Sequence, residues 1–382
     1  MKYKRKKNKK KEHIKILFIT ILCYLDLLRF KKIISIENDM NNIESYFKLC
    51  NNSNVNDLDF FERKLFPKIS IISPIYNRGE YLIRFLKSIQ NQNFYDIEIL
   101  LIDDCSSDNT VNLIKKYQSI DKRILLIKNK KNFGTFKSRN LGILKSTGKY
   151  LILPDPDDIL SQNCLKIFYT FATQYDYELL RFNLYIGGNK IFFSDCANPT
   201  PSIPVFKPKI QTFLFYATHK LRQIDFNISN KFIKREALIR ALNCFPKAYL
   251  NMHITNFEDG ILNYMLYRTV ESFYFLKKIG YYYIRNRHSI SIKGFTSDTI
   301  KCIFIHLKLV FEFSRNTLYE KNMFNALFKR LVIRKSFIKR LKLMKANFKF
   351  YINSINIFLE NEFVSTNSKK YLIQLKNSLI KA

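Results

Sequence analysis

The chain has 382 residues, 47% of them hydrophobic, so it is long enough to bury one large core. Its formal net charge of +34 would attract polyanions, anionic lipids or a diphosphate-bearing substrate. Lysine is scattered along the whole sequence, with no zinc-finger spacing or RNA-recognition signature, so we expect no nucleic-acid partner. The seven cysteines are odd in number and include no C-x-x-C, which excludes a complete disulfide framework.

Residues 1–32 form a basic N-terminus, in which KYKRKKNKKK precedes an apolar stretch from Ile14 to Leu28. This stretch is short for a spanning helix and contains Asp26. Three interpretations remain: a type II signal anchor, an interfacial basic helix and a soluble amphipathic helix. We expect the anchor, which predicts a single-pass type II membrane protein of the secretory pathway, with a soluble or membrane-peripheral protein as the alternative. Residues 33–66 would then be a stem or linker.

From residue 67 onward, short apolar runs alternate with segments of helical period. The predicted strands lie within residues 68–77, 96–105, 123–129 and 149–158, and the predicted helices within 80–92, 106–117 and 133–148. Such alternation with short connections predicts an α/β fold with a parallel sheet covered by helices. No glycine-rich phosphate loop follows the first strand, which argues against a dinucleotide-binding or P-loop enzyme.

Carboxylates follow two of the predicted strands. Asp103 and Asp104 end the second strand, and Asp155, Asp157 and Asp158 end the fourth. Ligands of open α/β sheets bind at the carboxyl ends of the strands, so both sets should reach one crevice. Their mutual repulsion favours a divalent cation, which usually brings substrate phosphates with it. Alternatively, the first pair caps the following helix, and a D-x-D pattern alone often arises by chance.

Four segments in this order resemble glycosyltransferase family 2: SPIYN at 73–77, DDCSSDNT at 103–110, NFGTFKSRNLGI at 132–143 and DPDD at 155–158. Three later segments also resemble the family: NKFIKREAL at 230–238, NFEDGILNYML at 256–266 and YYYIRNRHSISI at 281–292. The resemblance covers roughly Lys68 to Ser291. It implies a GT-A fold, with a Rossmann-like, mostly parallel sheet flanked by helices, over residues 67–294. The basic residues 295–382 have helical spacing and would either pack on this domain or face a membrane.

The resemblance implies an enzyme that moves a sugar from a nucleotide-sugar donor, with a UDP-sugar favoured, to a hydroxyl of a glycan or lipid-linked acceptor. The reaction would proceed with inversion and with the help of Mn²⁺ or Mg²⁺. Two other functions stay open. One is transfer to a lipid phosphate, as in dolichol-phosphate sugar synthases, and the other is a catalytically inactive fold that binds polyanions or membranes.

The resemblance also implies a role for each matching residue. Asp259 would be the catalytic base, and Asp157, with Asp158 a close second, would bind the metal ion. The nucleotide sugar would contact the other site residues, which are Pro74, Tyr76, Asp103, Asp104, Lys137, Arg139, Asp155, Arg285, Arg287 and His288. The Glu258–Asp259 pair could instead complement the N-terminus of a helix. Family members often have glycine where this chain has Cys105, a change that is tolerable if φ there is not positive.

Overall fold

The computed structural model describes residues 67–187, 192–193, 205–206, 227–284, 297–313, 349–360, 364 and 366–380. The predicted anchor and stem lie outside the described residues, and so does much of the basic C-terminal region.

The first half of the described chain alternates strands and helices as predicted. The elements are β1 (Ile69–Ile75), α4 (Gly79–Gln90), β2 (Ile97–Asp103), α5 (Thr110–Ile120), β3 (Ile124–Lys128), α6 (Thr135–Lys145) and β4 (Tyr150–Ile152). Every residue of β1 and β2 is buried, as their apolar runs require of central strands covered on both faces. On α4 the buried side chains include Leu82, Phe85, Leu86 and Ile89, which is the predicted helical period.

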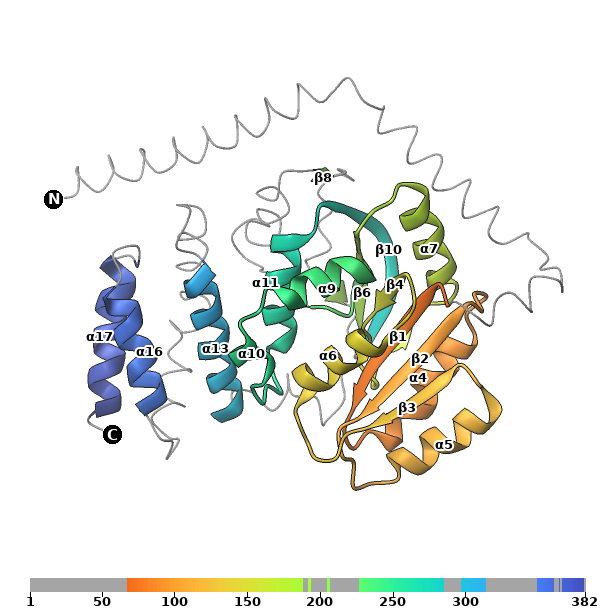
Figure 1. Cartoon of the computed structure of the whole chain (residues 1–382), viewed down its shortest axis with the longest axis horizontal. Helices are drawn as coiled ribbons and strands as arrows, with labels where there is room; N and C mark the ends of the chain where they lie inside the picture. Colours follow the sequence, from red (N-terminus) through yellow and green to blue (C-terminus); the bar gives the residue numbers. More distant parts are fainter. Residues whose placement is uncertain are drawn as a thin grey trace, which may run out of the picture. The chain divides into compact units, whose positions relative to one another are not determined.

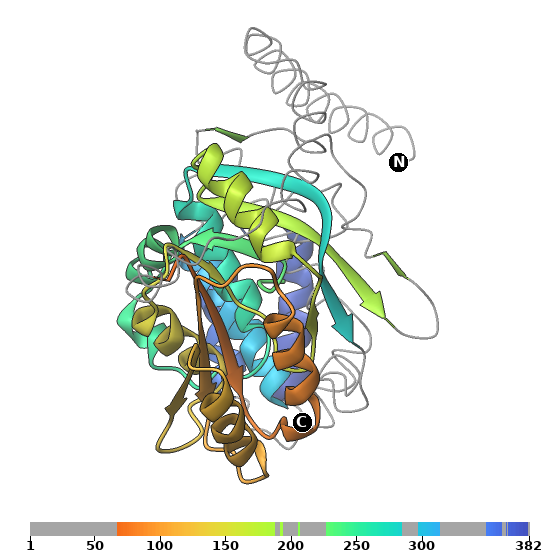
Figure 2. The same ribbon diagram turned by 90° about the vertical axis from the view of Figure 1, so that its right-hand side faces the viewer.

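These strands form a parallel sheet in the order β3-β2-β1-β4. The chain moves outward from β1 to β3 and then returns across the sheet to β4. Because such crossovers are right-handed, α4 and α5 cover one face and α6 the other, and α4 and α6 lie on opposite sides of β1 in Figures 1 and 2. The strand order therefore reverses between β1 and β4, which is where an open α/β sheet forms its crevice.

The second half extends this sheet with strands of both directions. Its elements are β5 (Ile159–Leu160), α7 (Cys164–Gln174), β6 (Leu179–Gly187), β7 (Phe192–Phe193), β8 (Val205–Phe206), β9 (Lys231–Lys234), α9 (Arg235–Asn243), α10 (Lys247–Leu250), α11 (Glu258–Thr269) and β10 (Ser272–Ile284). β9 lies antiparallel between β4 and β6, whereas β10 is parallel to β6 and antiparallel to β5. No strand was predicted beyond residue 158, so the antiparallel position of β9 between β4 and β6 was not expected from the sequence.

Three helices follow: α13 (Ser297–Phe313), α16 (Lys349–Leu359) and α17 (Thr366–Ile380). Their buried side chains, among them Phe304, Phe358 and Leu372, belong to the same apolar cluster as Leu238 of α9 and Met265 of α11. The described helices of the C-terminal region thus pack through apolar faces. α11 is buried on nearly all sides, so its first residues are firmly placed.

Candidate active site

Acidic side chains from three elements gather near the reversal of strand order. Asp103 is the last residue of β2, Asp155 follows the end of β4, and Glu258 and Asp259 are the first residues of α11. The sequence predicted the first two positions from the ends of apolar runs. It could not show how α11 reaches them.

Arg139 of α6 joins three of these carboxylates. Its Nη2 lies 2.9 Å from Asp155 Oδ1, and its Nη1 lies 2.9 Å from Glu258 Oε1 and 2.7 Å from Asp259 Oδ1. The guanidinium is only 1% exposed. Arg139 is therefore enclosed by carboxylates in this structure, and its contact with the donor phosphates stays a prediction.

This cluster of one guanidinium and three carboxylates carries an excess of negative charge when all its members are ionised. Burial, followed by the nearby Asp259, raises the pKa of Glu258 to about 7, although Arg139 opposes the shift. The pKa of Asp155 is also raised, by burial above all and by the surrounding carboxylates, again against Arg139. Such a site favours an additional cation close to its open side.

Asp104 is held by the loop that precedes α6. Its Oδ1 accepts hydrogen bonds from Asn129 Nδ2 at 2.7 Å and Phe133 N at 2.8 Å, and its Oδ2 accepts one from Gly134 N at 2.8 Å. Asp104 is 3% exposed and already accepts these three hydrogen bonds, so it fixes the loop before α6, and its contact with a nucleotide base stays a prediction. Gly134 has φ of +87°, and a Cβ there would lie 2.8 Å from Ile254 O, so glycine is needed for this contact.

Neither acid of the 103–104 pair caps α5, so that alternative is wrong. Asp103 Oδ1 accepts from Ser106 N at 3.2 Å, while Asp108 Oδ1 accepts from Thr110 N at the start of α5. The expectation for Cys105 also needs correction, because its φ is +68° and the residue lies in the left-handed region. The cysteine is thus accommodated at some cost in backbone strain.

The end of β1 and the loop after it carry two predicted residues, Pro74 and Tyr76, and one residue that the sequence did not single out, Asn77. Pro74 lies within β1 opposite Ile102, and the Tyr76 side chain is 47% exposed, as a base-stacking residue would need to be. Asn77, at φ of +50°, accepts hydrogen bonds from Ser107 N at 2.8 Å and Asp108 N at 3.3 Å through its Oδ1. Asn77 therefore ties the β1–α4 loop to the β2–α5 loop. In the sequence, the only indication of this role was that Asn77 is the last residue of the PIYN motif.

Lys137 lies on α6 with its Nζ 4.6 Å from the centre of the Phe133 ring, beside the loop that holds Asp104. Arg285, Arg287 and His288 lie outside the described residues, so their predicted role over the diphosphate stays a prediction.

The Asp155–Asp158 segment, called the acid loop below, is held from both sides. Arg84 of α4 donates a hydrogen bond to the backbone oxygen of Asp157 at 2.6 Å, and Arg78 Nε lies 3.9 Å from Asp157 Oδ2. On the other side, Asp158 accepts from Tyr281 of β10 at 2.6 Å. Burial, followed by the charge of Asp157, raises the pKa of Asp158 to about 7.

Two carboxylates of the acid loop suit a divalent ion. The side chains of Asp155 and Asp157 are 33% and 17% exposed, and both offer oxygen ligands. Within the described part of the chain, no three His, Cys, Asp or Glu side chains are arranged so that they could hold a metal ion by themselves. Mg²⁺ commonly uses one or two carboxylates plus substrate phosphates, so Asp155 and Asp157 fit an ion that arrives with the donor.

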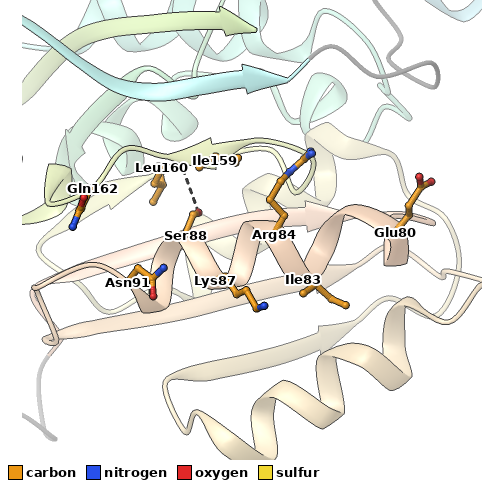
Figure 3. Close-up of a pocket in the computed structure, with 9 residues that line it drawn as sticks. All are labelled: Glu80, Ile83, Arg84, Lys87, Ser88, Asn91, Ile159, Leu160 and Gln162. Atoms are coloured by element: carbon orange, nitrogen blue, oxygen red, sulfur yellow. Dashed lines mark hydrogen bonds between the residues drawn. The ribbon is translucent and has the colours of Figure 1, made fainter. Parts of the chain in front are cut away.

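A groove of about 800 Å³ lies behind the acid loop, between α4 and β5 (Figure 3). Arg84, Ser88 and Leu160 are among its lining residues, and Leu160 N donates a hydrogen bond to Ser88 Oγ at 3.2 Å. None of the predicted site residues lines this groove. The groove is connected to the site through Arg84, which lines the groove and donates a hydrogen bond to the backbone oxygen of Asp157 in the acid loop.

The model of glycosyl transferase family 2 matches residues 70–240 of the chain. An uncharacterized glycosyltransferase of Methanocaldococcus jannaschii is 30% identical over 233 residues, which are 55% of this chain and 79% of that protein. The glycosyltransferase GlyG of Streptococcus pneumoniae serotype 4 is 32% identical over 117 residues, or 31% of this chain and 39% of GlyG. The chain spans only 15% to 43% of the length of GlyG and four other curated relatives.

Among solved structures, residues 1–349 of S. aureus TarS in complex with UDP-GlcNAc superpose with a TM-score of 0.62 and 17% identity. The superposition covers 82% of this chain and 88% of that one. This similarity confirms the predicted α/β fold of the GT-A type. No helix in the described ranges is long and apolar enough to cross a membrane.

Proposed function

Because the chain belongs to glycosyl transferase family 2, we propose that it transfers a sugar from a nucleotide-sugar donor to a hydroxyl of a glycan or glycoconjugate. The observation that supports this most is the Arg139 cluster. One buried guanidinium joins Asp155, from the predicted donor side, to Asp259, the predicted base, at 2.9 and 2.7 Å. The proposed donor-binding residue Asp155 and the proposed base Asp259 are thus both held by the buried Arg139 side chain.

Asp259 would accept the proton of the attacking hydroxyl. Its Oδ1 is fixed by Arg139, whereas its Oδ2 accepts, among the described residues, a long hydrogen bond of 3.4 Å from Ile228 N. The side chain is 23% exposed, so an acceptor can approach it. A carboxylate with one oriented and one accessible oxygen suits a general base in a single displacement, which predicts inversion at the anomeric carbon.

Asp155 and Asp157 would hold a Mn²⁺ or Mg²⁺ ion together with the donor diphosphate. When bound, the ion would neutralise charge that develops on the leaving nucleoside diphosphate. Asp104 and Tyr76 would bind the nucleotide base, and the UDP-GlcNAc bound to TarS favours a UDP-sugar as the donor. We also propose that residues 14–28 attach the protein to a membrane.

The test is transfer and hydrolysis of UDP-, GDP- and CMP-sugars by the purified chain, with and without Mn²⁺. Asp259→Asn should lower transfer about 100-fold or more, because it removes the base, while UDP should still raise the melting temperature. Asp176→Asn is the matched control, since Asp176 is 71% exposed and pairs with Lys234 away from the cluster.

Different outcomes separate the alternative functions. Near-normal transfer by Asp259→Asn would favour a phosphate acceptor, which needs no base, and would exclude the proposed hydroxyl chemistry. Absence of both turnover and UDP binding in the unmodified chain would favour an inactive, polyanion-binding protein.

A further inference from the structure

Asp158 makes two short hydrogen bonds within the protein. Its Oδ2 accepts from the Tyr281 hydroxyl at 2.6 Å, and its Oδ1 accepts from the backbone nitrogen of Ile284 at 2.7 Å. The residue is 1% exposed. A buried carboxylate must be satisfied in this way, because an unpaired one would be strongly destabilising.

Tyr281 connects the two ends of the acid loop. Its hydroxyl donates a hydrogen bond to Asp158 and accepts one from the backbone nitrogen of Asp155 at 3.0 Å. Tyr281 is fully buried within β10, where it lies opposite Leu160 of β5 and Leu184 of β6. Tyr281 therefore links the two ends of the acid loop, in addition to the backbone hydrogen bond from Asp158 N to Asp155 O at 3.2 Å.

We propose that Asp158 and Tyr281 are positioning residues, which hold the acid loop so that Asp155 and Asp157 face the donor, and that Asp158 does not bind the metal ion. This inference rests on the proposed function and refines its metal site, since the sequence offered Asp158 as a second ligand.

The geometry of the loop separates the two roles. Asp155 and Asp157 keep partly exposed carboxylates, at 33% and 17%, whereas Asp158 is turned into the protein. Mg²⁺ and similar ions retain several waters and so need an approach from solvent, which a side chain exposed by 1% does not offer. Arg84 holds the middle of the loop through Asp157 O, so the loop is fixed at its two ends and its centre.

The first experiment measures amide hydrogen exchange in the metal-free chain, for the peptide that contains Asp155. Tyr281→Phe keeps the ring but removes the acceptor for the Asp155 amide, so exchange there should become about tenfold faster. Tyr282→Phe, on the next and partly exposed residue of β10, is the control and should leave the exchange unchanged. Unchanged exchange in Tyr281→Phe would overturn the proposal, whether or not the chain transfers sugar.

The second experiment measures the Mn²⁺ concentration that gives half-maximal turnover of the donor. Tyr281→Phe and Asp158→Asn should each raise this Mn²⁺ concentration about tenfold. The double variant should need no more Mn²⁺ than either single variant, because both substitutions remove the same contact. An effect of Asp158→Asn without any effect of Tyr281→Phe would identify Asp158 as a metal ligand and refute the positioning role. Absence of turnover in the unmodified chain would refute the proposed function, and the exchange result would still decide the role of Tyr281.

Discussion

Replacing Glu258 by glutamine should stabilise the protein at pH 8, even though it removes an ion pair with Arg139. The side chain is 11% exposed, and its pKa in the folded state is about 7, against an ordinary value of 4.5. At about 1.4 kcal/mol per pH unit, keeping Glu258 ionised costs about 3 kcal/mol of folding free energy above pH 7. Glutamine has nearly the shape of the protonated acid and cannot ionise, so it avoids this cost.

The sign of the pH dependence follows from the same values. Between pH 4.5 and 7 the folded state retains the Glu258 proton more strongly than the unfolded state, so stability falls as the pH rises through this window. The gain from Glu258→Gln should therefore be about 3 kcal/mol at pH 8 and close to zero below pH 4.5.

Urea unfolding at pH 8 and pH 4, followed by circular dichroism, would measure both values. Glu360→Gln, at an exposed site after α16, is the control and should change stability by less than about 0.5 kcal/mol at either pH. If Glu258→Gln lowered stability at pH 8, the attraction of Arg139 would outweigh burial, and the reasoning would be refuted.

Two further predictions concern the backbone. Cys105→Gly should raise the free energy of unfolding by about 1 kcal/mol, since glycine adopts φ of +68° without strain, whereas Cys105→Ala should give no such gain in urea titrations. Gly142→Ala should destabilise the protein by about 1–3 kcal/mol, because a Cβ there would lie 2.7 Å from Ile102 Cδ1 and closer still to Ile72. A melting temperature unchanged by Gly142→Ala would show that α6 can shift away from the sheet.

The sequence was sufficient for the parallel half of the fold because its signals there are local. The strands around Ile71 and Leu100 are apolar runs bounded by turns, and the helix that carries Phe85 has a clear period. The acids lie where such runs end, so their meeting at one crevice follows from topology alone. The similarity to the TarS structure confirms the predicted fold, whereas the meeting of the acids in one donor site stays a prediction.

The arrangement of the site itself depends on contacts between distant residues. Nothing near Arg139 in the sequence shows that three carboxylates surround it, and nothing in DPDD distinguishes the buried Asp158 from the partly exposed Asp157. The partner that distinguishes them, Tyr281, lies 123 residues further along the chain. The positive φ of Cys105 could not be predicted from the sequence either, because cysteine, unlike glycine, does not indicate a left-handed backbone conformation.

Arg139 is separated from Glu258 by 119 residues and from Asp259 by 120, and this distance along the chain has a consequence for how the protein acquires its structure. Contacts this remote form late, because a long loop must first be closed. During synthesis, α6 leaves the ribosome well before α11, so the guanidinium has Asp155 as its only carboxylate partner from this cluster until the second half of the sheet has docked. The Arg139 cluster is therefore completed in the last stages of folding, and a chain truncated before α11 would contain the strands β1 to β4 without Glu258 and Asp259.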